Sequence, residues 1–117
     1  MTSQEVLLNQ LAQNPAQIQF EDVMSVIEYN YLYELAAFKN GLAYNAVDQN
    51  QGSAKLFAFA QLNKLTKEQT LALFGQHYRA VLATPQADDH QNIRQFMANG
   101  WEGIEFENFP IICKEFK

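Results

Sequence analysis

The sequence has one cysteine, three prolines and five glycines among 117 residues. Because Cys113 has no partner cysteine in the chain, no intrachain disulfide can form, and folding does not require an oxidising compartment. No apolar run approaches the length of about 20 residues that spans a bilayer. The first residues, MTSQEVLLNQ, lack the basic start of a secretory signal, so we expect a cytoplasmic protein. Secretion by a type III system is an alternative, because it needs no cleaved signal.

Positive charge is also scarce. Eight Lys and Arg residues against 13 Asp and Glu residues give a net charge of −5. Nucleic-acid binding relies on basic residues that neutralise phosphates, and binding to anionic membranes relies on a basic amphipathic helix, so we expect neither. Apolar residues make up 48% of the chain, enough for one hydrophobic core. The sequence therefore predicts a single domain over residues 1–117.

Most of the chain has helical periodicity. Thr2 and Glu5 have the spacing of a capping box at the start of a first helix. Apolar spacing predicts a second helix from about Asp22 to Asn30. The segment from Ala54 to Leu62 is apolar on nearly every side, which predicts a helix buried at the centre of the fold. Ser53 stands where the N-cap of that helix is expected.

Two further helices are expected in the second half of the chain. A second capping box, at Thr66 and Gln69, opens a helix that continues to about Ala83. Asp88 or Asp89 is expected to cap a last helix, from about His90 to Asn99. Gly100 then follows at a C-terminal position that favours positive φ.

One segment indicates β-structure instead. Asn40-Gly41 lies between apolar residues and predicts a hairpin, because both residues of the turn can adopt positive φ. We expect strands at about Ala36–Lys39 and Leu42–Asn45, and the alternation in Gly103–Phe106 offers a third strand. The predicted fold class is α+β, a mainly α compact bundle of about five helices with a small β element.

Polar side chains are densest between Asp89 and Trp101. His90 and Arg94 lie four residues apart and share one helix face. An imidazole beside a guanidinium can act as a general base next to an anion site. Alternatively, both pair with Asp88, Asp89 or a neighbouring helix and are structural. Arg79 would strengthen an anion site if it converged with Arg94.

The loop before the central helix offers a second candidate. Asn50, Gly52 and Ser53 would present free backbone amides to an anion at the helix start, with Lys55 adding charge. The phosphate-loop pattern GxxxxGK[ST] is absent, and a Gly-Ser helix start is often purely structural. The candidate ligand-binding residues are Asn50, Ser53, Lys55, Arg79, Asp89, His90, Gln91, Asn92, Arg94 and Trp101.

Signals for metal or covalent chemistry are weak. His77, His90 and Cys113 are too dispersed along the chain to form a metal-binding motif. No nucleophile elbow is present. We therefore expect no metal and no cofactor, and we predict no defined catalytic activity.

Several blocks, taken together in order, resemble the HopJ type III effector family. The resemblance covers about Phe20 to Phe106. It is carried by FKNG (38–41), NQGSAKLFAFAQL (50–62), QTLALFGQHYRAVL (69–82), DDHQNIRQFM (88–97) and GWEGIEF (100–106). The family's name implies injection of some members into host cells, but it implies no activity, cofactor or catalytic residue.

Two functions remain open. The first is an interaction protein that docks on a protein partner, a host protein if the chain is exported. The cluster Tyr29, Tyr31, Tyr33 and Tyr44 is either such a surface or the edge of the core. The second is an intracellular protein that binds or transforms a small anionic ligand through Arg79, His90, Arg94 and the loop from Asn50 to Lys55.

Overall fold

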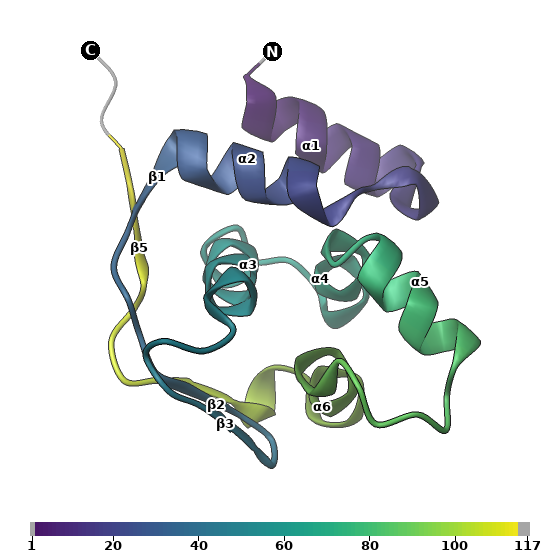
Figure 1. The fold of residues 1–117 in the computed structure, drawn as a ribbon. Coiled ribbons are helices and arrows are strands. Elements are labelled where there is room, and N and C mark those ends of the chain that lie inside the picture. The colour runs from purple at the N-terminus through teal and green to yellow at the C-terminus, as the bar shows by residue number, and fades with distance from the viewer. Residues whose placement is uncertain (1, 115–117) are drawn as a thin grey trace.

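The computed structural model describes residues 2–114, which form an α+β fold. Its α-helices are α1 (Ser3–Gln13), α2 (Phe20–Asn30), α3 (Gln51–Leu62), α4 (Lys67–Leu73), α5 (Gln76–Ala83) and α6 (Gln91–Asn99). Its strands are β1 (Tyr31–Tyr33), β2 (Phe38–Asn40), β3 (Ala43–Asn45), β4 (Ile104–Phe106) and β5 (Ile111–Cys113). In Figure 1, α1 and α2 form one layer above α3 and α4, while α6 and the β2–β3 hairpin lie below. The predicted fold class, mainly helical with a small β element, is confirmed.

Helix α3 is the centre of the core, as its apolar composition predicts. The ring of Phe57 contacts four other rings, those of Phe38 in β2, Phe74 after α4, Phe96 in α6 and Trp101, with centroid distances of 6.1, 5.4, 5.0 and 6.3 Å. One residue of α3 thus joins the hairpin to two other helices. The buried residues of α3 are Ala54, Leu56, Phe57, Ala58, Phe59 and Ala60.

The hairpin forms, and it recruits the third strand. Strands β2 and β3 are antiparallel, and β4 pairs with the other edge of β2, with Ile104 opposite Asn40. The two turn residues are Gly41 and Leu42, and only Gly41, at φ 59°, has positive φ. The expectation that Asn40 also adopts positive φ is wrong, because the glycine takes the first position of the turn. Asn40 is instead a fully buried strand residue.

The helix expected from Thr66 to Ala83 is broken into α4 and α5. Gly75 separates them with φ 60°, and a Cβ at Gly75 would lie 2.7 Å from the carbonyl oxygen of Ile18 and from the amide nitrogen of Phe20. The backbone that leads into α2 occupies the space of a side chain at this position. A contact so distant in sequence leaves no local signal in a helical pattern.

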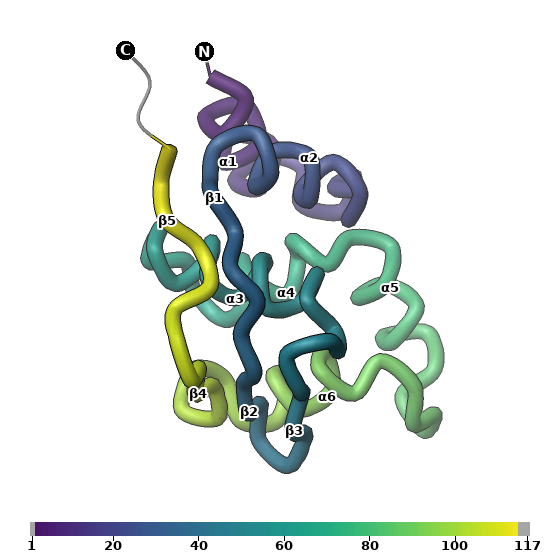
Figure 2. The backbone as a smooth tube through the Cα atoms, turned by 60° about the vertical axis from the view of Figure 1, so that its left-hand side comes forward, coloured from purple at the N-terminus to yellow at the C-terminus, as the bar shows by residue number. Residues whose placement is uncertain are grey.

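A second pair of strands was not expected. Strands β1 and β5 are antiparallel, with Leu32 opposite Ile112, and they run side by side in Figure 2. We call this pair the β1–β5 ribbon. The tyrosines considered above as a possible docking surface lie in two environments. Tyr31 is buried, whereas Tyr29 and Tyr44 are largely exposed.

Candidate functional site

A cavity of about 560 Å³ lies where α3 and α6 begin. Strand β3, the start of α2 and the start of α5 complete its walls. We call it the N-terminal pocket, because it is bordered by the N-terminal ends of these helices. The lining residues are Phe20, Ala43, Tyr44, Asn45, Gln49, Asn50, Gly52, Ser53, Phe74, His77, His90, Gln91, Asn92 and Ile93.

Helix α3 enters the pocket without a side-chain cap. Asn50 is the N-cap and adopts the left-handed conformation, with φ 50° and ψ 41°. The expectation that Ser53 is the N-cap is wrong, because asparagine tolerates this conformation and starts the helix earlier. The backbone amides of Gln51, Gly52 and Ser53 find no acceptor within residues 2–114. Two of these three residues, Gly52 and Ser53, line the pocket.

Helix α6 begins in the same way. His90 is its N-cap, at φ 51° and ψ 48°, and makes no side-chain capping bond. The expectation that Asp88 or Asp89 caps this helix is wrong. The carboxylate of Asp89 instead accepts a hydrogen bond of 2.7 Å from Arg94. The amides of Gln91 and Asn92 therefore also lack an acceptor in the described part of the chain.

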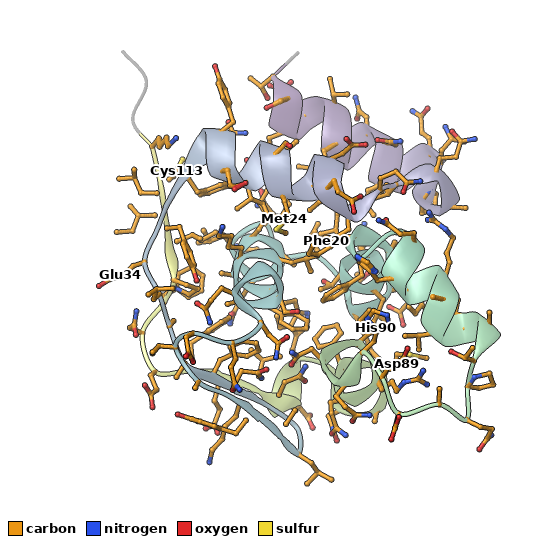
Figure 3. The ribbon with its side chains drawn as sticks, in the orientation of Figure 1. Phe20, Met24, Glu34, Asp89, His90 and Cys113 are labelled. Atoms are coloured by element: carbon orange, nitrogen blue, oxygen red, sulfur yellow. The ribbon has the colours of Figure 1, made fainter. Side chains whose placement is uncertain are left out.

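The two histidines of the chain meet at this pocket. The ring centroids of His77, in α5, and His90 lie 5.3 Å apart. Phe20 contacts His77 edge to face, at 5.1 Å between centroids. Figure 3 shows Phe20 at the start of α2 and His90 below it, beside α5. Phe20, His77 and His90 thus form a continuous row of rings along one wall, which we call the ring wall.

Buried asparagines hold the pocket's polar side. Asn40, Asn45 and Asn92 are 0%, 2% and 8% exposed. The Asn92 carboxamide oxygen accepts bonds of 3.1 Å from both Asn40 and Asn45, and its amide donates to Asn45 at 3.0 Å. Asn50 also donates to Asn45, at 2.7 Å. This asparagine network fixes the starts of α3 and α6 against the ends of β2 and β3.

Arg94 and Asp89 form a cluster of their own, outside the pocket lining. Besides its bond to the carboxylate, Arg94 donates through Nε to the Asp89 backbone oxygen at 2.6 Å, and its Nη2 reaches the hydroxyl of Thr84 at 3.3 Å. The hydrogen bond from Arg94 holds the pKa of Asp89 below its usual value, with the nearby charge of His90 adding to the effect. Asp89 lies 3.9 Å from Nε2 of His90. Arg94 lines a separate cavity beside Val81 and Pro85.

The remaining sequence candidates are also placed elsewhere. Arg79 donates to the Ile18 carbonyl at 3.0 Å and lines a third cavity, so the two arginines do not line a common cavity. Lys55 pairs with Glu28 at 3.8 Å and lies over the ring of Tyr33. The indole nitrogen of Trp101 donates to the Leu65 carbonyl. Of the ten candidates, the pocket brings together Asn50, Ser53, His90, Gln91 and Asn92.

Several pocket residues were not among the candidates. Phe20 lies just before the predicted second helix and has no functional signal in the sequence, and the sequence offers His77 only as a weak metal-binding candidate. The sequence indicates Asn45 only as the end of a strand. One signal pointed to His77: it and His90 are the only histidines. Their juxtaposition depends on the break at Gly75, which sequence periodicity does not reveal.

Other chemistries find little support in the described residues. No group of three or more His, Cys, Asp or Glu side chains among residues 2–114 is placed to hold a metal ion. Cys113 is exposed on β5, on the opposite side of Figure 3 from His90. None of the described helices combines the length and apolar character needed to cross a membrane.

Comparison with known proteins gives one family and one solved relative. The family described as HopJ type III effector protein matches residues 4–111. A crystal structure described as that of "unknown function protein VPA0580" superimposes with a TM-score of 0.92 at 51% sequence identity, covering 97% of this chain and 95% of that chain. No protein with a curated description matches significantly.

Proposed function

The chain belongs to the HopJ type III effector protein family, and we propose that it is a small binding protein that holds a small anionic molecule in the N-terminal pocket. The observation that carries this proposal is the convergence of two uncapped helix starts and both histidines on one cavity of about 560 Å³. Cavities of roughly 300 to 1,000 Å³ are typical of small-molecule sites.

The helix starts supply the attraction for an anion. Amide groups at the first turn of a helix are unpaired within the helix, and the helix dipole adds partial positive charge there. Among the described α-helices, α1 and α4 satisfy one of these groups with the capping side chains of Thr2 and Thr66, whereas α2, α3, α5 and α6 have no side-chain cap. In α3 and α6 the amides stay available, so an oxyanion between them would receive donors from both helices.

The histidines add a second source of attraction. A protonated imidazole donates from both ring nitrogens, and a neutral imidazole offers one donor and one acceptor. In either form, His77 and His90, which both line the cavity, can therefore donate a hydrogen bond to a bound anion.

A thermal-shift screen tests this function. The probes are inorganic phosphate and a panel of phosphorylated and carboxylated metabolites. A ligand at 100 times its dissociation constant adds about 2.7 kcal/mol to the free energy of unfolding. For a domain of this size the melting temperature then rises by about 10 °C.

Two variants make the screen specific to the pocket. Ala43→Phe fills the cavity from β3, a position where an aromatic residue suits the strand. Arg94→Lys is the control, because it alters a cationic side chain that lines a different cavity. Ligand stabilisation lost in Ala43→Phe and retained in Arg94→Lys supports the proposal. Equal stabilisation in both variants places the ligand outside the pocket and refutes it.

A second function, docking on a protein, is supported by the β1–β5 ribbon. Leu32 and Ile112 are paired in register and are 58% and 65% exposed. Within residues 2–114 neither strand has another partner strand. An extended segment of a partner protein can add to such an edge through main-chain hydrogen bonds, with apolar side chains giving specificity.

The double variant Leu32→Lys with Ile112→Lys tests this second function. Both positions are exposed, so the fold should tolerate lysine, which discourages strand pairing at an edge. A partner captured from host-cell extract should be lost with this variant and retained with Ala43→Phe. Capture that is unchanged by the lysines rules out the ribbon as the docking surface.

A further inference from the structure

The ring wall restricts the ligand class beyond the presence of a negative charge. Phe20, His77 and His90 contact one another in sequence along the cavity, at centroid distances of 5.1 and 5.3 Å. Phe74, which also lines the cavity, is stacked on Phe20 with an interplanar angle of 11°. Gly52 keeps this wall close to α3, since a Cβ there would lie 3.2 Å from the Phe20 ring. Such a wall favours a flat, unsaturated ligand.

The scarcity of charged side chains in the cavity lining restricts the class of ligand further. None of the lining residues, all of which belong to the described chain, is Asp, Glu, Lys or Arg. A ligand with several phosphates would enter without side-chain counterions, and burying uncompensated charge is unfavourable. The helix starts and the histidines suit one anionic group, and the rest of the ligand must be neutral.

Two other lining residues, Gln49 and Asn50, have free amide groups that match the edge of a heterocycle. Gln49 uses its oxygen to accept from the Ala46 amide, and its Nε2 has no partner within residues 2–114. Asn50 uses its nitrogen to donate to Asn45, and its Oδ1 likewise has none there. One donor and one acceptor on neighbouring residues complement an edge that offers an acceptor and a donor, which is the pattern of nucleobases.

We propose that the pocket takes a nitrogen heterocycle bearing a single phosphate, the size of a nucleoside monophosphate, with its ring stacked on Phe20 and its edge against the two histidines, since the planes of Phe20 and His77 are inclined by 69°. This inference rests on the proposed function, because the phosphate occupies the anion site between α3 and α6. The heterocycle is the additional claim.

Isothermal titration of the full chain separates the ring from the phosphate. The probes are AMP, UMP, ribose 5-phosphate and inorganic phosphate. Stacking of one base on an aromatic side chain is expected to tighten binding by at least about tenfold. At least one of the two nucleotides should therefore bind at least about tenfold more tightly than ribose 5-phosphate. Ribose 5-phosphate binding as tightly as both nucleotides overturns the heterocycle claim and leaves the anion site standing.

Variants of the ring wall add a second readout. Phe20→Leu keeps an apolar side chain but removes the ring, so nucleotide affinity should fall by about tenfold while ribose 5-phosphate binding is unchanged. Phe109→Leu is the matched control, since Phe109 is exposed and outside the lining. Nucleotide affinity that falls equally in both variants, or in neither, contradicts the inference.

An NMR measurement on the wild-type protein tests the same inference even if the Phe20→Leu variant does not fold. In proton NMR, the base protons of the bound nucleotide should move upfield and receive saturation transfer from aromatic protons of the protein. Transfer to the ribose alone overturns the stacked arrangement. No binding by any of the four probes, combined with binding of a carboxylate from the wider screen, refutes the heterocycle claim but supports the proposed function. No binding by any anion refutes both.

Discussion

Helices α4 and α6 begin in opposite ways. At α4, Thr66 accepts from the Gln69 amide and the Gln69 side chain accepts from the Thr66 amide, so a complete capping box closes the helix start. At α6, His90 stands in a left-handed conformation, makes no capping bond and lines a cavity. The start of α4 follows the sequence rules for helix capping, and its cap stabilises the helix. The start of α6 does not follow these rules.

The same contrast separates α1 from α3. Thr2 caps α1 in an extended conformation, whereas Asn50 starts α3 in the left-handed region. A left-handed residue other than glycine or asparagine raises the free energy of the fold by about 1 kcal/mol. Both left-handed caps line the same cavity. Departures from local consistency are expected at functional sites, and here two of them coincide.

The largest expected effect tests whether the asparagine network holds the uncapped starts. Asn92→Ala removes three buried side-chain hydrogen bonds with Asn40 and Asn45. Asn40 keeps its bond to the Asn92 backbone oxygen, and Asn45 keeps the bond that it accepts from Asn50. The free energy of unfolding should fall by about 3 kcal/mol, measured by urea denaturation. Asn99→Ala, an exposed change in the same helix, should alter it by less than about 0.5 kcal/mol. Equal effects would show that the network does not stabilise the fold.

Loss of the capping box should have a smaller effect. Thr66→Ala removes the hydroxyl that accepts from Gln69, so the free energy of unfolding should fall by about 1 kcal/mol. Thr66→Ser keeps the acceptor and should retain most of the stability. A ligand that binds the pocket should bind both variants as it binds the wild type. Weaker binding to Thr66→Ala alone would mean that α4 also contributes to the site.

Substitution of the N-cap of α6 should have the opposite effect: ligand affinity changes and stability does not. His90→Gly relieves the left-handed strain but frees the unfolded backbone, so the free energy of unfolding should change by no more than about 0.5 kcal/mol. Ligand affinity should nevertheless fall, because the imidazole is lost. Lys64→Gly is the matched control, since Lys64 is also left-handed at φ 54° and lies outside the pocket lining. Loss of affinity in both variants would argue for a general backbone effect.

The smallest expected effect concerns acid stability. The lowered pKa of Asp89 means that its ionised form is favoured in the folded state. Its contribution to stability is therefore present above the ordinary carboxylate pKa of 3.8 and is lost as the pH falls through the lower folded value. Urea midpoints for wild type and Asp89→Asn should converge below pH 3.8. A gap that persists at low pH would assign the difference to a cause other than ionisation.

Much of the fold could be predicted from the sequence because it follows local patterns. The Thr2 cap, the capping box at Thr66, the buried helix α3 and the hairpin at Gly41 each follow a short-range rule of chain geometry. The last helix was also expected, although its cap was not. These elements need only their own residues to be recognised.

The pocket could be predicted only in part, because it depends on contacts between distant segments. Gly75 turns the chain because the backbone at Ile18 approaches it, and that turn brings His77 to His90. Asn40 enters the network because the turn begins one residue later than expected. Arg94, the most conspicuous candidate, is largely occupied by Asp89. The sequence indicated both helix starts but not that they face one cavity.

The most direct test of the site is an NMR titration of the ¹⁵N-labelled protein with inorganic phosphate. A bound anion perturbs the amides that donate to it, and these lie in two segments far apart in the sequence. The account predicts concerted shifts of the Gln51, Gly52 and Ser53 amides together with those of Gln91 and Asn92. Shifts confined to one helix start, shifts centred on the arginines, or none at all would contradict it.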